Sequence, residues 1–312
     1  MMPSGVGTSA HMTEARITKN AEALVQSSDQ AFPKQQQEPP GLTEAMDPRP
    51  DHGEETYQGS GRLKDLRALI TGGDSGIGRA VAIAYAREGA DVAISYLPEE
   101  QPDAEETATW VEKAGRKVVL LPGDIREEST CQEVATKAAS ELGGVDVLVN
   151  NAGYQMARQQ GLEEISTEQL DRVFKTNLYA MFWLTKAILP HLKKGASIIN
   201  CASIQAYEPS TSLLDYASTK AAINNFTVNL AADLGPRGIR VNAVAPGPIW
   251  TPLQPATQPA EKIEKFGLDT PLGRPGQPGE VAPAFVFLAS PSDAGYVSGT
   301  VLGVTGGKPV FQ

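Results

Sequence analysis

Tyr216 and Lys220 are the first residues whose types and spacing indicate chemistry. They lie four residues apart in the segment "DYASTK", within a helical pattern, so both project from one helix face. A free phenol is a poor base because its pKa is about 10, but a neighbouring ammonium stabilises the phenolate and lowers that pKa. Tyrosine–lysine pairs at this spacing are also common on helix surfaces, so the pair needs partners before it indicates acid–base catalysis.

Two polar residues elsewhere in the chain are the candidate partners. Ser203 follows the apolar run "SIINC", 13 residues before Tyr216, just past the end of an expected strand. Asn177 lies in the pattern "FKTNLYAMFW", inside a long expected helix. A polar side chain on an otherwise apolar helix needs a hydrogen-bond partner, which an active-site water supplies.

The segment "TGGDSGIG", residues 71–78, connects an apolar run to a helical pattern. Where a strand of a parallel sheet meets a helix N-terminus, free N–H groups and the helix dipole favour a phosphate. Gly72 permits the tight turn, Gly76 lets a pyrophosphate approach, and Gly78 lets the helix pack on the strand. The other residues of this predicted nucleotide loop are Asp74, Ser75 and Ile77. A glycine turn without a ligand is the alternative.

Alternating strands and helices must position these residues. Apolar strand-like runs are expected at 67–71, 91–96, 117–121, 145–150, 196–202, 239–245 and 300–304, and helical patterns at 76–88, 103–114, 127–142, 167–193, 214–234 and 279–289. Strands that are apolar throughout belong to a parallel sheet covered on both faces. The sequence therefore predicts an α/β fold, a Rossmann-type doubly wound parallel sheet of about seven strands with helices on both faces.

The second strand ends at Tyr96, near the expected site of the adenosine ribose. An acidic residue at that point would hold the 2′-hydroxyl of NAD, and the run "AISYLPEE" has Tyr96 and Leu97 there instead. No carboxylate stands there to repel a 2′-phosphate, but the glycine loop carries Asp74 and Ser75 and no arginine to attract one. The sequence is therefore only weakly biased, towards NADP or towards both cofactors. Strand-end residues expected to flank the adenosine are Asp124, Ile125, Asn151, Ala152 and Gly153.

Composition limits the classes of partner and compartment. The net charge of −10 disfavours nucleic acid and anionic membranes as partners. We find no apolar stretch of membrane-spanning length and no signal-peptide core. The only two cysteines, Cys131 and Cys201, match no metal-ligand spacing and fit a reducing cytoplasm; the apolar run around Cys201 indicates a buried thiol.

Residues 1–60 differ from the rest of the chain. They hold six prolines, six glutamines and nine acidic against four basic residues, with weak apolar periodicity. We expect an extended or disordered arm on the surface of a single domain spanning residues 61–312.

The chain from about residue 62 to 306 resembles the single-domain branch of the short-chain dehydrogenase/reductase family. The resemblance rests on "TGGDSGIG", "NNAG", Asn177, Ser203, "YASTK" and "APGPIWT". The segment "YQGSGRLKDLRALITGGDSGIGRA" and the preceding "MDPRPDHGEE" further resemble a bacterial subgroup with an N-terminal extension, described as NADP-dependent aldehyde reductases or stress-induced oxidoreductases. The four catalytic positions match the family, and the departures in the glycine loop and at Tyr96 affect only the cofactor preference.

This resemblance implies a role for each matching residue. Tyr216 would be the general acid in carbonyl reduction and the base in alcohol oxidation, while Lys220 would lower its pKa and hold the nicotinamide ribose. Ser203 would hydrogen-bond the substrate oxygen, and Asn177 would hold a water that links Lys220 to solvent. Residues expected to orient the nicotinamide are Pro246, Gly247, Ile249 and Thr251. The family also implies a homotetramer built on the helices at 167–193 and 214–234, and no metal.

Segment 248–277 is rich in proline and interrupts the alternation of strands and helices, which predicts an active-site lid. Candidate substrate-binding residues are Met156, Gln205, Tyr207 and Trp250. Alternatively, Tyr207 and Trp250 only pack the lid or a subunit contact.

Three functions remain open at this stage. The leading prediction is an NAD(P)-dependent oxidoreductase for a carbonyl/alcohol pair, such as an aldehyde, ketone or sugar. A nucleotide-sugar epimerase or dehydratase would usually carry a different glycine spacing and a larger C-terminal part. A nucleotide-binding module without catalysis is disfavoured by the intact Asn177, Ser203, Tyr216 and Lys220.

Overall fold

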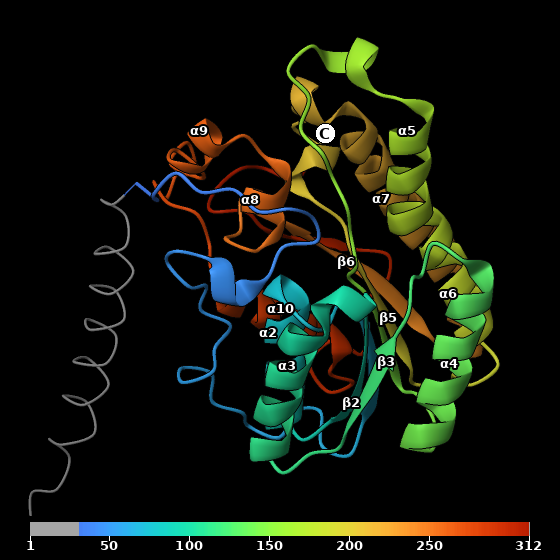
Figure 1. Ribbon diagram of the computed structural model, residues 1–312. Helices are drawn as coiled ribbons and strands as arrows, with labels where there is room; N and C mark the ends of the chain where they lie inside the picture. The colour runs from blue at the N-terminus through green and yellow to red at the C-terminus, as the bar shows by residue number, and fades with distance from the viewer. Residues whose placement is uncertain (1–30, 312) are drawn as a thin grey trace, which may run out of the picture.

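The computed structural model describes residues 31–311, so the first 30 residues of the predicted arm lie outside the described part. Its centre is a seven-stranded parallel sheet in the order β3-β2-β1-β4-β5-β6-β7 (Figure 1). The strands are β1 (Arg67–Thr71), β2 (Asp91–Tyr96), β3 (Val118–Pro122), β4 (Val147–Asn150), β5 (Ser197–Cys201), β6 (Arg240–Pro246) and β7 (Val301–Val304). Every expected strand is present, with its ends within two residues of the prediction, and the predicted fold class is confirmed.

Helices cover both faces of this sheet (Figure 1). The long helices are α2 (Gly76–Arg87), α3 (Gln101–Lys113), α4 (Glu128–Leu142), α5 (Thr167–Phe174), α6 (Ala180–Ile188), α7 (Leu214–Leu234) and α10 (Pro278–Ala289). One prediction is wrong: residues 167–193 are not a single helix. A π-helical turn, η4 (Lys175–Tyr179), separates α5 from α6, and α6 ends at Ile188.

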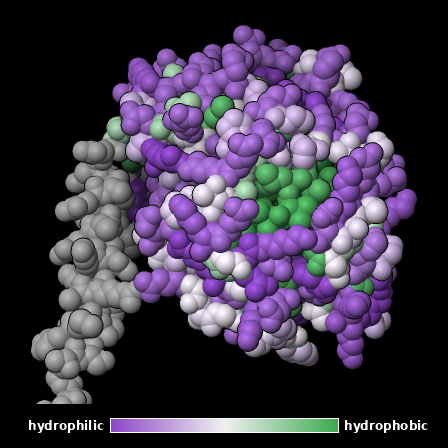
Figure 2. All heavy atoms as spheres, turned by 60° about the horizontal axis from the view of Figure 1, so that its bottom comes forward, coloured by the Kyte–Doolittle hydropathy of each residue, from purple (hydrophilic) through white to green (hydrophobic). Residues whose placement is uncertain are grey.

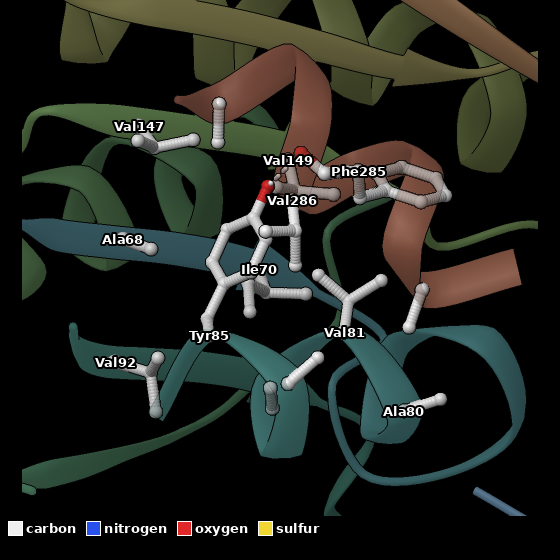
Figure 3. Packing of buried hydrophobic residues seen from close by; sticks show 14 of the residues in the cluster. Ala68, Ile70, Ala80, Val81, Tyr85, Val92, Val147, Val149, Phe285 and Val286 are labelled. Carbon is white, nitrogen blue, oxygen red and sulfur yellow. Dashed lines mark hydrogen bonds between the residues drawn. The ribbon is translucent and has the colours of Figure 1, made fainter. Parts of the chain in front are cut away.

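The two faces have separate apolar cores because each strand buries side chains in both directions. On one face α2 and α10 pack against β1 and β4. Val81 and Tyr85, one helical turn apart on α2, lie against Ile70 and Phe285, and the Tyr85 hydroxyl donates to the Phe285 carbonyl at 3.1 Å (Figure 3). On the other face α4 and α6 cover the same strands.

The strand order places a topological switch between β1 and β4. The chain moves outward from β1 through β2 to β3, then returns to β4 on the other side and continues to β7. Helices on opposite faces therefore diverge at the carboxyl ends of β1 and β4, which leaves a crevice there. The glycine loop, "NNAG" and the end of β5 all lie at this edge.

Residues 31–57 run along the outside of the domain without joining the sheet. They contain one 3₁₀ turn, η1 (Thr43–Ala45), and are otherwise irregular. In Figure 1 this blue segment runs beside α8 (Leu253–Thr257) and then along α2 and α3. Segment 248–277 contains α8 and the short helix α9 (Ala260–Ile263).

The surface in Figure 2 is largely hydrophilic, with one hydrophobic area near the middle of the view. Among residues 31–311, no helix has both the length and the apolar character needed to cross a membrane.

Candidate active site

The glycine loop turns sharply from β1 into α2, and its glycines are required by close contacts. Gly72 has a φ of +60°, in the left-handed region that favours glycine. A Cβ on Gly78 would lie 1.7 Å from the carbonyl oxygen of Gly72, so no side chain fits there. A Cβ on Gly76 would lie 3.0 Å from the Thr251 side chain, so this glycine keeps the gap between loop and lid open.

Arg79, which the sequence analysis did not single out, anchors the loop. It is fully buried on α2, and its Nε donates to the Asp74 carbonyl at 2.8 Å. Its guanidinium also pairs with Asp103 and Glu106 of α3, each at 2.9 Å. The buried cation therefore fixes the loop backbone to α3. The only feature of the sequence that could have indicated this role is the place of Arg79 on the expected buried face of the helix.

The end of β4 is tied to the same loop. The N–H groups of Asn151 and Ala152 both donate to the Thr71 hydroxyl at 3.0 Å, and the Asn151 side-chain amide donates to the carbonyls of Thr71 and Gly72. Asn151 thus supports the turn that holds the phosphate-binding N–H groups, in addition to lining the cavity beside it.

Three of the four predicted catalytic residues line one cavity. Tyr216 and Lys220 project from α7, and the Lys220 ammonium lies 5.3 Å from the centre of the Tyr216 ring. The Lys220 Nζ also donates to the Cys201 carbonyl at 2.7 Å, which holds it at the end of β5. Ser203 caps the next turn: its Oγ accepts from the Gln205 N–H at 3.1 Å, so its hydroxyl proton is left to donate into the cavity.

Asn177 stands behind the cavity wall instead of in it. It occupies the π-helical turn, and such turns are frequent at functional sites. Its side chain bonds both backbone groups of Tyr154, at 2.7 and 2.9 Å, and donates to Thr219 at 3.1 Å. A Cβ on Gly153 would lie 3.7 Å from both Asn177 Oδ1 and Lys220 Nζ. Asn177 is therefore adjacent to Lys220, but most of the hydrogen-bonding capacity of its side-chain amide is used by Tyr154 and Thr219.

The cavity runs from the glycine loop to the Tyr216–Lys220 pair and includes most of the predicted cofactor residues. These are Gly72, Asp74, Ser75, Gly76, Ile77, Tyr96, Asp124, Ile125, Asn151, Ala152, Gly153, Pro246, Gly247, Ile249 and Thr251. Gly78 lies behind them, where its role is packing. Lid residues at the cavity wall are Pro252, Leu253, Gln254 and Thr257.

None of the four predicted substrate residues lines this cavity. Trp250 is fully buried, stacks on Phe32 at 3.9 Å between ring centres, and donates from Nε1 to the Pro48 carbonyl at 2.7 Å. The structure thus favours the packing interpretation of Trp250. Tyr207 packs against the apolar cluster beneath α7, and the Gln205 side chain accepts from the Ser210 N–H at 2.7 Å. Met156 lies outside the cavity in the segment beside α8.

The end of β2 differs from the sequence interpretation in one chemical respect. The absence of a carboxylate at the strand end was inferred from Tyr96 and Leu97 in the run "AISYLPEE", but Asp74 and Glu100 both line the cavity with these two residues. Glu100 folds back so that its carboxylate accepts from the Leu97 N–H at 3.0 Å. Asp74 is buried, and its Oδ2 has no partner among the described residues.

Burial perturbs both carboxyl groups. It raises the pKa of Asp74 to about 6, against a smaller opposing effect of its hydrogen bond to Ser75. Burial and the nearby Asp74 charge raise the pKa of Glu100 to about 8. Near pH 7 this pair therefore carries a charge that changes with pH.

Two cationic residues at the cavity wall, Arg126 and Arg172, were missed by the sequence analysis, and Arg126 pairs with the predicted residue Asp124. Burial disfavours the charge of Asp124, but its hydrogen bonds with Arg126 leave the pKa below its usual value. Arg172 lies 3.9 Å from the centre of the Tyr154 ring. These residues follow strand ends or lie on α5, so only the folded chain brings them together.

Both cysteines are free and buried, which confirms the expectation for Cys201, and burial raises the pKa of each thiol. Within residues 31–311, no group of three or more His, Cys, Asp and Glu side chains is arranged to hold a metal ion.

Comparisons with known proteins agree with this geometry. A family model described as "Enoyl-(Acyl carrier protein) reductase" matches residues 72–308. The oxidoreductase YhxD of Bacillus subtilis is 54% identical over 302 residues, which covers 96% of this chain and 99% of the relative. NADPH-dependent aldehyde reductase 1, chloroplastic, of Arabidopsis thaliana is 45% identical, covering 87% of this chain and 96% of the relative.

Solved structures with bound nicotinamide cofactors share the fold. A short chain dehydrogenase from Burkholderia cenocepacia in complex with NADP has a TM-score of 0.73 and 33% identity, covering 79% of this chain and 99% of that one. A 3-ketoacyl-(acyl-carrier-protein) reductase from Brucella melitensis complexed with NADH has a TM-score of 0.71 and 32% identity, covering 80% of this chain and all of that one.

Proposed function

The chain belongs to the short-chain dehydrogenase/reductase family, and we propose that it moves a hydride between a nicotinamide cofactor and a carbonyl/alcohol substrate, with Tyr216 as the general acid and base. One observation carries the proposal: Ser203, Tyr216 and Lys220 line the same cavity as the glycine loop. A dinucleotide fits that loop because its glycines leave open the space that side chains would fill, at the N-terminus of α2.

The bound nicotinamide supplies the hydride to the carbonyl carbon in reduction and accepts it from the carbinol carbon in oxidation. In reduction, Tyr216 donates its hydroxyl proton to the carbonyl oxygen as the alcohol forms, and in oxidation it takes that proton back. Ser203 donates a hydrogen bond to the same oxygen and stabilises its developing charge. Lys220, held by the Cys201 carbonyl, places a positive charge beside the phenol ring.

Asn177 contributes by holding a water molecule next to Lys220. Because its amide N–H groups are engaged by Tyr154 and Thr219, only one acceptor site on Oδ1 remains for a water next to Lys220. We assign to that water the delivery of protons from solvent.

Aldehydes are the substrate class we propose first, because the Arabidopsis relative is named an aldehyde reductase. Segment 248–277 would close over the substrate as a lid, since six of its residues line the cavity. The test is an assay of nicotinamide absorbance with NADPH and NADH separately, against short aldehydes, ketones, quinones and sugars. Cofactor oxidation by one carbonyl class supports the proposal. Cofactor binding without turnover on any class counts against it and favours the non-catalytic alternative.

We propose that both cofactors bind and that the choice between them depends on pH. The weak preference for NADP inferred from the sequence rested on the lack of a carboxylate at the end of β2, whereas Glu100 lines the cavity beside Tyr96 and Leu97, together with Asp74 of the glycine loop. Arg126, a cation that also lines the cavity, is already paired with Asp124. A 2′-phosphate would therefore be tolerated when the pair is protonated and repelled as it ionises.

The assembly and the compartment are also proposals. Large apolar side chains on the outer face of the helices between residues 167 and 234 are about half exposed: Leu170, Tyr179, Phe182 and Val228. Such a face suits the helical interface of a homotetramer, which the mass of the protein in solution tests. Two free buried cysteines and the absence of disulfides among residues 31–311 support work in a reducing cytoplasm.

A further inference from the structure

The arm contacts both walls of the cofactor cavity, although the proposed chemistry does not use it. Pro39 and Pro40 line the cavity together with the glycine loop and α8. Hydrogen bonds attach the arm to the rest of the domain on either side of these prolines, at Gln37 and Thr43. We call residues 37–43 the strap.

One end of the strap is attached to the lid. The Gln37 N–H donates to the Pro255 carbonyl of α8 at 3.0 Å. The Gln37 side chain bonds both backbone groups of Leu42, at 2.8 and 3.2 Å, and so closes the strap into a compact loop. These hydrogen bonds fix the conformation of the strap and hold it next to α8.

The other end of the strap is attached to the nucleotide loop's own support. The N–H and the hydroxyl of Thr43 both donate to Asp103 Oδ2 at 3.0 Å. Asp103 is buried and also binds Arg79, the residue that fixes the Asp74 carbonyl. The strap thus spans from the lid to α3, and the prolines between its two ends cover the cavity.

Close packing keeps the strap against the lid. Gly41 has a φ of +82°, and a Cβ on it would lie 2.9 Å from the Pro252 carbonyl and 3.0 Å from the Ala256 Cβ. Farther along the arm, Met46 packs with Trp250 and Ile263 in one buried cluster, and Trp250 donates to Pro48. Arm and lid therefore form one packed unit, and displacement of one disturbs the other.

We propose that residues 37–43 form part of the dinucleotide site: Pro39 and Pro40 cover the bound cofactor where it passes from the glycine loop toward the lid. The proline rings supply rigid apolar contact without N–H groups that would need partners. We expect the strap to slow the entry and release of the cofactor. The inference rests on the proposed function, because it requires a bound dinucleotide.

The test compares two glycines that share a backbone conformation but differ in surroundings. Gly41→Ala places a methyl group against Pro252, whereas Gly61→Ala is the control, since Gly61 has a φ of +83° and nothing within 4 Å of a Cβ. Both variants carry the same backbone strain. Only Gly41→Ala displaces the strap. A double variant, Pro39→Ala with Pro40→Ala, removes the rings without any clash and serves if Gly41→Ala fails to fold.

Nicotinamide fluorescence gives the dissociation constant and, in a stopped-flow displacement experiment, the dissociation rate of NADPH and NADH. We expect Gly41→Ala or the double proline variant to release cofactor roughly tenfold faster than wild type, with Gly61→Ala within about twofold of wild type. Equal release rates for the strap variants and the control would overturn the inference. If wild-type protein binds neither cofactor, the proposed function itself fails, which separates the two results.

Discussion

We expect Glu100 to make the cofactor preference depend on pH in a way that can be measured. With a pKa of about 8, it is ionised in roughly a tenth of molecules at pH 7 and roughly nine-tenths at pH 9. Asp74, with a pKa of about 6, is largely ionised across that range. Only NADP carries a 2′-phosphate, so a new negative charge at Glu100 weakens NADP binding more than NAD binding.

The size of the effect follows from Coulomb's law. Two unit charges about 5 Å apart repel by roughly 1–3 kcal/mol at effective dielectric constants between about 60 and 20. Because about a tenth of the Glu100 side chains are still protonated at pH 9, the NADP-to-NAD affinity ratio should fall about 3- to 9-fold between pH 7 and pH 9. Arg79 does not cancel this change, since it is paired with Asp103 and Glu106.

Fluorescence titrations of both cofactors at pH 7, 8 and 9 measure the ratio directly. Glu100→Gln should make it nearly independent of pH in this range. Glu99→Gln is the matched control, because Glu99 is exposed and does not line the cavity. A ratio that changes less than about twofold in wild type, or a change that survives in Glu100→Gln, refutes the assignment of Glu100 to the 2′ position.

Two further predictions concern stability. Arg79→Met should destabilise the protein by about 3–5 kcal/mol in chemical unfolding, because it leaves Asp103 buried without its cation. If the variant unfolded at the same denaturant concentration as wild type, Arg79 would not be the stabilising anchor of the loop. Burial opposes the charge of Glu88, but hydrogen bonds from Arg62 and Tyr57 dominate and lower its pKa to about 2. Because the folded-state pKa lies below the usual glutamate value of 4.5, the carboxylate stabilises the fold above about pH 4.5, and this contribution is lost as the pH falls toward 2. The stability difference between wild type and Glu88→Gln should narrow over that range in thermal unfolding, and a constant difference counts against it.

Local patterns were sufficient for most of the fold. Each strand is a short apolar run between turn signals, and the glycine spacing in "TGGDSGIG" reflects contacts as close as that of Gly78 with the Gly72 carbonyl. The π-helical turn at Asn177 could not be predicted, because its periodicity differs from that of an α-helix over only five residues. The sequence around it reads as one continuous helical pattern.

Contacts between distant segments account for the differences at the site. Trp250 looked like a substrate-facing aromatic because its partner, the proline-rich arm, carries no periodic signal of its own. Glu100 follows the strand by four residues, and only the turn that bonds it to Leu97 brings it back to the cavity beside Tyr96. Such placements depend on tertiary packing, which a single sequence does not reveal.

The central claim is that Tyr216 transfers the proton while the cofactor is held by other residues. Its most direct test measures turnover and cofactor binding of wild type and Tyr216→Phe side by side, with the carbonyl substrate found in the absorbance assay. We predict that Tyr216→Phe loses turnover by roughly 100-fold or more while its cofactor dissociation constant stays within about twofold. A variant that keeps more than about a tenth of the wild-type rate would contradict the assignment of Tyr216 as the acid.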